Sequence, residues 1–236
     1  MDMLLKVIIA ILFLFNSLYS FSQPFERFKL SQNQIGSSIP EYHDNSGESA
    51  WSPVYHQYYF PHCQQACGVY HMFGYEMNVL RSKSGSLDAN TYPANFTFNF
   101  WNQDTQNGVS FFDSFRILYD HGQPNLSDFG DDYKVFAMYW MNGADKWERS
   151  MTQRIDRVYS FDVTTYSGIE DLKHWLYNHG NGSSKGGVAV FSTGGPWQLN
   201  WIPQASPLNW ITLCPILYYP ASHGLTIVGY HDGVYF

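Results

Sequence analysis

Pro53-Val54-Tyr55-His56-Gln57 is the stretch on which the interpretation of this chain depends, and Cys63 follows its glutamine by six positions. A second stretch, Ser222-His223-Gly224-Leu225-Thr226-Ile227-Val228-Gly229-Tyr230, places a histidine at the start of an apolar run near the C-terminal end. A thiol, an imidazole and a side-chain amide are groups that acyl transfer through a covalent intermediate uses. The two stretches together indicate a cysteine nucleophile served by residues far apart in the sequence.

In this order and spacing, the two stretches resemble the papain-like cysteine peptidases. In that family Pro-Val-x-x-Gln precedes the nucleophilic cysteine, and His-x-x-x-x-Val-Gly-Tyr follows much later. The resemblance implies that Cys63 is the nucleophile, His223 the base, and Gln57 an oxyanion donor together with the backbone N–H of Cys63. It also implies an α+β fold with a helical N-terminal lobe, a β-barrel-like C-terminal lobe and the site in the cleft between them. The implied reaction is hydrolysis of peptide bonds in a polypeptide substrate, without a metal or an organic cofactor.

The chemistry requires a cysteine that ionises near neutral pH, whereas a free thiol has a pKa of roughly 8.5. Cys63 falls at the expected start of a long helix, where the unsatisfied N–H groups favour a thiolate. His223 beside it, as an imidazolium, would favour the thiolate further.

Three departures from the family pattern leave alternatives open. Gln64 stands where the family has an aromatic residue, and Phe60 stands where it has an additional cysteine. The Asn-Ser-Trp motif that orients the family's histidine does not occur before Phe236, so we expect a C-terminally incomplete domain. The alternatives are an inactive papain-like fold that binds peptides or glycans, and another thiol acyl-transfer enzyme such as an amidase.

The cysteines Cys63, Cys67 and Cys214 allow one disulfide and one remaining thiol. Cys67 is the rival nucleophile, but Pro61 would then occupy the glutamine's place and offers no amide donor. We expect Cys67 to pair with Cys214; the alternative is that all three thiols are reduced and buried. A metal held by Cys63, Cys67 and His71 is disfavoured, because ligands at this helical spacing converge only if the helix bends.

Residues 1–22 are typical of a secretory signal peptide, with Lys6 before an apolar run and cleavage expected before Gln23. The alternative is an uncleaved membrane anchor. We expect a secreted, periplasmic or cell-surface protein that leaves the membrane after signal cleavage. The net charge of −7 argues against a nucleic-acid partner, and the sequence leaves the oligomeric state open.

Residues 23–50 are polar and turn-rich and predict an extended lead-in, and residues 51–236 form the expected peptidase domain. Apolar residues at three- and four-residue steps predict a helix from Cys63 to about Ser84, with Gly85 as its stop. Similar patterns predict the remaining elements: a helix or turn at 92–100, helices at 111–118, 140–154 and 168–178, and strands at 158–163, 187–192 and 225–230.

Overall fold

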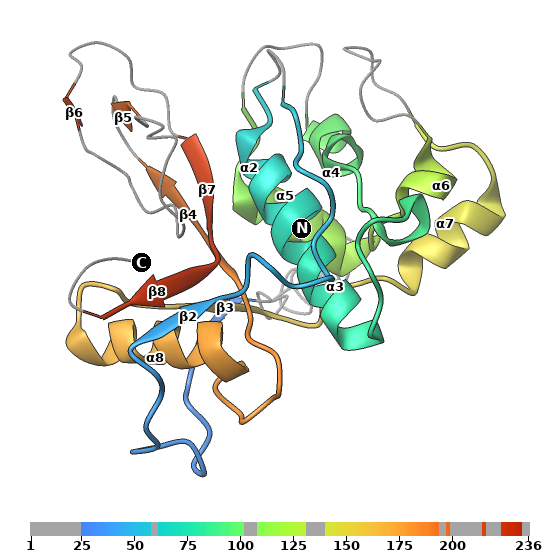
Figure 1. The fold of residues 1–236 in the computed structure, drawn as a ribbon. Helices are drawn as coiled ribbons and strands as arrows, with labels where there is room; N and C mark the ends of the chain where they lie inside the picture. The colour runs from blue at the N-terminus through green and yellow to red at the C-terminus, as the bar shows by residue number, and fades with distance from the viewer. Residues whose placement is uncertain are drawn as a thin grey trace, which may run out of the picture.

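The computed structural model describes seven stretches of the chain: residues 25–57, 61–101, 108–130, 140–193, 197–198, 214–215 and 223–232. The expected signal peptide, residues 1–22, lies outside them. In the view of Figure 1 the helices α2 to α7 gather on one side, and most of the strands lie with helix α8 on the other. The fold is thus a mixture of helices and strands, as the sequence predicts.

The central helix of the helical part is continuous from Cys63 to Arg81. It consists of α2 (Cys63–Gln65), the π-helical segment η1 (Ala66–Phe73) and α3 (Gly74–Arg81). The helix forms because its apolar residues recur on one side, and Val69 and Tyr75 there are completely buried. A π-helical segment is uncommon and often occurs at functional sites; the sequence pattern does not reveal it.

The central helix ends three residues earlier than expected. Ser82 takes the left-handed conformation, with φ of 52°, and closes the helix. Gly85, the predicted stop, has another role, because a Cβ there would lie 2.3 Å from the backbone carbonyl carbon of Trp51. Gly85 therefore permits close packing of two backbone segments.

Four further α-helices and a short 3-10 turn complete the described helical part. Serine and asparagine N-caps start two of them: Ser110 Oγ accepts the N–H of Asp113, and Asn125 Oδ1 accepts the N–H of Asp128. The predicted helices are confirmed, although the one expected at 140–154 is shorter. The elements are η2 (Asp88–Asn90), α4 (Ala94–Trp101), α5 (Phe111–Asp120), α6 (Leu126–Phe129) and α7 (Ala144–Met151).

The described strands form four two-stranded sheets, and none of these sheets closes into a barrel. The pair nearest the candidate site is β4 (Ala189–Thr193) with β7 (His223–Ile227), which run antiparallel. The strand expected at 225–230 is divided in two, because β8 (Gly229–His231) leaves β4 and pairs with β2 (Tyr42–Asp44). The fourth pair is β5 (Trp197–Gln198) with β6 (Cys214–Pro215).

The lead-in belongs to the folded structure. Strand β1 (Phe25–Arg27) pairs in parallel with β3 (Val158–Ser160), and β2 lies against β8. Phe28 is buried and its ring contacts that of Trp175 in α8 (Tyr166–Asn178). Residues 25–44 therefore contribute both strand pairing and core packing.

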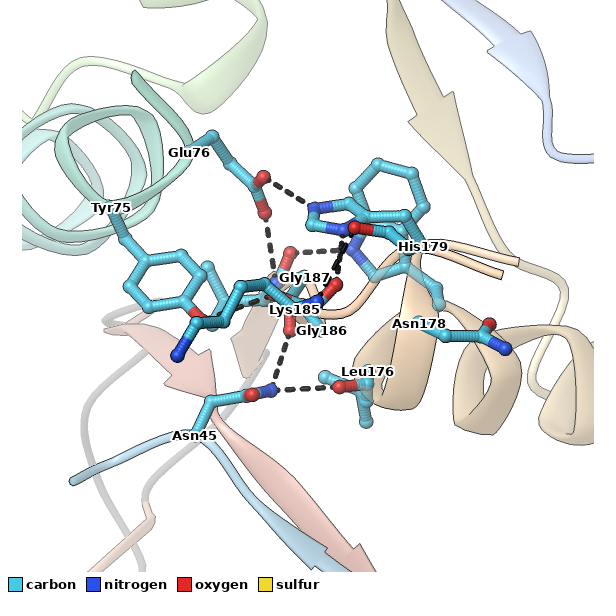
Figure 2. A network of polar contacts seen from close by, with 12 residues as sticks. Asn45, Tyr75, Glu76, Leu176, Asn178, His179, Lys185, Gly186 and Gly187 are labelled. Carbon is cyan, nitrogen blue, oxygen red and sulfur yellow. Dashed lines mark hydrogen bonds and ion pairs between the residues drawn. The ribbon is translucent and has the colours of Figure 1, made fainter. Parts of the chain in front are cut away.

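A polar network joins the central helix to the strand-rich part (Figure 2). The carboxylate of Glu76 in α3 accepts the backbone N–H of Val188 at 2.9 Å and contacts His179 Nε2 at 2.8 Å. The Tyr75 hydroxyl donates to the carbonyl of Gly186 at 3.0 Å. From the lead-in, Asn45 Nδ2 donates to the carbonyls of both Leu176 and Gly187. The turn between α8 and β4 is therefore held from two sides.

Candidate functional site

Cys63 is the first residue of α2, and its side chain is half-buried. His62 is the N-cap residue just before it and is completely buried. Burial lowers the pKa of His62 to about 4, although a hydrogen bond with the Asn95 side chain opposes this, so the ring is neutral. The candidate nucleophile therefore follows directly on a neutral, firmly packed residue.

Tyr55 ties the glutamine-bearing stretch to the start of the central helix. Its hydroxyl and His62 Nε2 lie 2.9 Å apart in a buried hydrogen bond, and its ring packs on that of Tyr70. Gln57 follows two residues later and is half-buried. Gln57 and Cys63 thus leave the same anchored region, and residues 58–60 between them lie outside the described part.

His223 opens strand β7 and is exposed, and the residue after it packs tightly on the central helix. Gly224 is buried, and a Cβ on it would lie 2.7 Å from Cys67 Sγ and 3.0 Å from the Cα of Gln64. Further along β7, the Thr226 hydroxyl donates to the Cys67 carbonyl at 3.5 Å. The two sequence stretches are therefore brought face to face, with His223 beside the start of the helix that begins at Cys63.

Partial burial lowers the pKa of His223. The ring is therefore neutral near pH 7, whereas the sequence analysis expects an imidazolium. A neutral imidazole can accept a proton from a thiol, so the described geometry suits a base more than a preformed ion pair.

Cys67 is a free thiol one turn into the helix, so the expected Cys67–Cys214 pairing is wrong. Its side chain is 6% exposed and its Sγ donates to the Cys63 carbonyl at 3.0 Å. Burial, together with the nearby Cys63, raises the pKa of Cys67 far above its ordinary value. Cys67 therefore stays protonated at any pH at which the protein works.

Gln64 and Gln65 have structural contacts that explain the departure from the family pattern. Gln64 Oε1 accepts the backbone N–H of Phe111 at 2.8 Å, at the start of α5. Gln65 is completely buried, and its Nε2 donates to the carbonyl of Val109 and the hydroxyl of Ser114, both at 2.8 Å. The sequence analysis missed both contacts; the only signal is a pair of amides within an apolar helix.

Within the described residues, no three histidine, cysteine, aspartate or glutamate side chains are grouped so that they could hold a metal ion. His71, the third residue of the metal alternative, packs between the rings of Trp51 and Tyr70. Burial lowers the pKa of His71 to about 4. In the same stretches no helix is both long enough and apolar enough to cross a bilayer.

No known protein family and no curated protein matches the sequence. Among solved structures, the fold is similar to that of xylellain, a cysteine protease from Xylella fastidiosa. The superposition has a TM-score of 0.54 at 12% identity and covers 87% of this chain and 75% of that chain. At this identity the similarity supports a cysteine protease-like fold and leaves the chemistry to be argued from the residues.

Proposed function

We propose that this chain is a cysteine peptidase of papain-like architecture that hydrolyses polypeptides through an acyl-enzyme. The observation that carries the proposal is the close approach of Gly224 to the start of the central helix, where a Cβ on Gly224 would lie 3.0 Å from the Cα of Gln64. That contact supports placing His223 next to Cys63, although the two residues are far apart in the sequence. The similarity to a cysteine protease fold adds independent support.

In the proposed reaction, neutral His223 takes the proton from Cys63 Sγ, and the sulfur attacks the carbonyl carbon of the substrate. The oxyanion that forms accepts hydrogen bonds from the Gln57 side-chain amide and from the backbone N–H of Cys63. That N–H lies in the first turn of the helix, where backbone donors have no intrahelical acceptor. His223 then gives its proton to the leaving amine, and water, deprotonated by His223, hydrolyses the thioester and restores the thiol.

The contacts of Cys67 favour Cys63 as the nucleophile. The Cys67 thiol is buried and protonated, and it already donates to the Cys63 carbonyl. Cys63 is half-buried and stands at the helix start.

The family resemblance completes the proposal with a two-lobe arrangement in which the site lies in the cleft between the lobes. The N-terminal sequence supports export of the protein, and hence a polypeptide substrate outside the cytoplasm. The competing function is an inactive fold that binds peptides or glycans. The observation in its favour is the lowered pKa of His223, which disfavours a thiolate–imidazolium pair.

Labelling with an electrophilic epoxide, followed by peptide mapping, distinguishes the two functions. We expect rapid labelling of Cys63 that His223→Ala abolishes and Cys67→Ala retains, together with hydrolysis of fluorogenic peptides. Slow labelling that is indifferent to His223→Ala, without peptide hydrolysis, would establish the binding function instead.

A further inference from the structure

Three elements meet at the Cys67 side chain. Its Sγ donates to the carbonyl of Cys63 in α2, and a Cβ on Gly224 in β7 would lie 2.7 Å from the same sulfur. The ring of Phe111 at the start of α5 closes the third side, since its Cζ lies 3.1 Å from that Cβ position. The residue next to His223 and the residue one turn after Cys63 are therefore in direct contact.

We propose that Cys67 and Gly224 are positioning residues, which together set the separation between the Cys63 thiol and the His223 ring. This inference rests on the proposed function, because it concerns the geometry of that catalytic pair. Cys67 acts through its bond to the Cys63 carbonyl, and Gly224 acts by letting β7 approach the helix.

The requirement at position 224 is one of space. Gly224 is not among the residues with a positive φ, so its backbone conformation is open to any L-residue. A Cβ at 2.7 Å from a sulfur and 3.0 Å from the Gln64 Cα is closer than real Cβ contacts allow, and the Cα is a backbone atom that cannot rotate away. An alanine here would therefore move the start of β7 away from the helix.

The size of this movement follows from ordinary contact distances. Ordinary Cβ contacts lie between 3.4 and 4 Å, so relief of the sulfur contact requires a displacement of about 1 Å. A misplacement of about 1 Å between reacting groups commonly costs about 100-fold in rate. His223 is the next residue along the strand, so it shares the displacement.

Position 67 suits a cysteine for two reasons. Sulfur fills the space between Gly224 and Phe111 without a branched Cβ, and its S–H supplies the donor for the Cys63 carbonyl. The protonated state that the raised pKa ensures is the state that can donate. The rival nucleophile of the sequence analysis thus receives a supporting role in the same site.

The test compares the rate at which iodoacetamide alkylates Cys63 at pH 7 in a set of variants, together with kcat/KM on a peptide. The His223→Ala variant defines how much of the rate depends on the histidine. We expect Gly224→Ala to lose about as much, roughly 100-fold in kcat/KM. In Gly224→Ala/Cys67→Ala the sulfur that opposes the new methyl is absent, so most of the loss should be recovered.

Two further variants keep the test decisive. Cys67→Ala alone leaves a gap beside Gly224 and removes the donor, and we expect alkylation of Cys63 to slow about tenfold while the protein remains folded. Gly85→Ala is the matched control, because its Cβ would clash with the Trp51 backbone far from β7. It should lower the melting temperature and leave the alkylation rate of Cys63 unchanged.

The outcomes separate this inference from the proposed function. If wild type and His223→Ala are alkylated equally and neither hydrolyses peptide, both are overturned. If they differ while Cys67→Ala and any folded Gly224→Ala react as wild type does, the catalytic pair stands and the positioning role is refuted. Failure of the double variant to exceed Gly224→Ala in rate, or in folded yield, would also contradict it.

Discussion

We expect Glu76→Gln to destabilise the protein below neutral pH and to have little effect at alkaline pH. The reason is the position of His179, whose Nε2 faces the Glu76 carboxylate and whose Nδ1 faces the Lys185 carbonyl, both at 2.8 Å (Figure 2). Both partners are acceptors, so only the doubly protonated imidazolium satisfies both contacts. Replacing the carboxylate with an amide of the same shape removes the charge while retaining an oxygen for the Val188 N–H.

The pKa of His179 moves upward as a balance of effects. Burial lowers it, but the hydrogen bond and charge of Glu76, with the Lys185 carbonyl, outweigh burial and raise the pKa above 6.5. A raised pKa in the folded state means that the stabilisation is fully present below the unfolded value of 6.5. It is lost as the pH rises through the folded pKa. Lys185 also pairs with Glu48, and both lie in the same network.

The magnitude lies between those of surface and buried pairs. The side chains of His179 and Glu76 are 13% and 28% exposed. Exposed pairs contribute up to about 1 kcal/mol, and breaking a buried pair costs about 3–5 kcal/mol. We therefore expect Glu76→Gln to cost about 2 kcal/mol at pH 6, which corresponds to about 4–8 °C in melting temperature for a chain of this size.

Thermal melts at pH 6 and pH 9, with urea titrations at both, measure the effect. The matched control is Asp128→Asn, which removes a carboxylate from the exposed pair with Arg149. Hydrogen bonds from Arg149 lower the pKa of Asp128, and Arg149 stays charged, so this loss should be the same at both pH values. A Glu76→Gln effect of equal size at pH 6 and pH 9 would refute the reasoning about His179.

Three other predictions concern stability. Gln65→Ala should cost about 2–3 kcal/mol in urea unfolding, because it leaves the buried Ser114 hydroxyl and the Val109 carbonyl without their amide donor; a loss below about 0.5 kcal/mol would contradict the buried bond. Deletion of residues 25–44 should yield a protein that binds hydrophobic dyes and is rapidly digested by trypsin, since β1 and β2 lose their places; a truncated protein that melts as the full chain does would show the lead-in to be dispensable. Thr165→Ala removes the N-cap that accepts the Gly168 N–H and should cost about 1 kcal/mol, whereas Thr165→Ser should retain most of the stability.

Local periodicity explains why much of the fold could be predicted from the sequence. The central helix, α5 and α8 each place apolar residues at helical spacing, and β4 is a short apolar run, so each pattern indicates its own element. Boundaries that depend on distant partners could not be predicted. The division of 225–230 into two strands arises because β7 and β8 pair with different parts of the chain.

The candidate site was predictable in its residue types and not in its supporting contacts. Spacing pointed to Cys63 and His223 through family resemblance, and the fold brings their segments together. The roles of Cys67 and Gln64 depend on which side chains of other elements approach them, and one sequence contains no signal for such approaches. The neutral state favoured for His223 likewise arises from burial, a property of the folded chain.

The network at Glu76 and the candidate site are linked through one pair of strands. Val188, which donates to Glu76, directly precedes β4, and the last residue of β4 pairs with His223 in β7. Gly224 attaches the other end of this strand pair to the start of the same continuous helix. The pair is thus held at two points, and loss of the Glu76 contact leaves the one beside Cys63 in place. We therefore expect Glu76→Gln to reduce stability much more than the alkylation rate of Cys63, and a drop of about tenfold or more in that rate would show that the two attachments do not act separately.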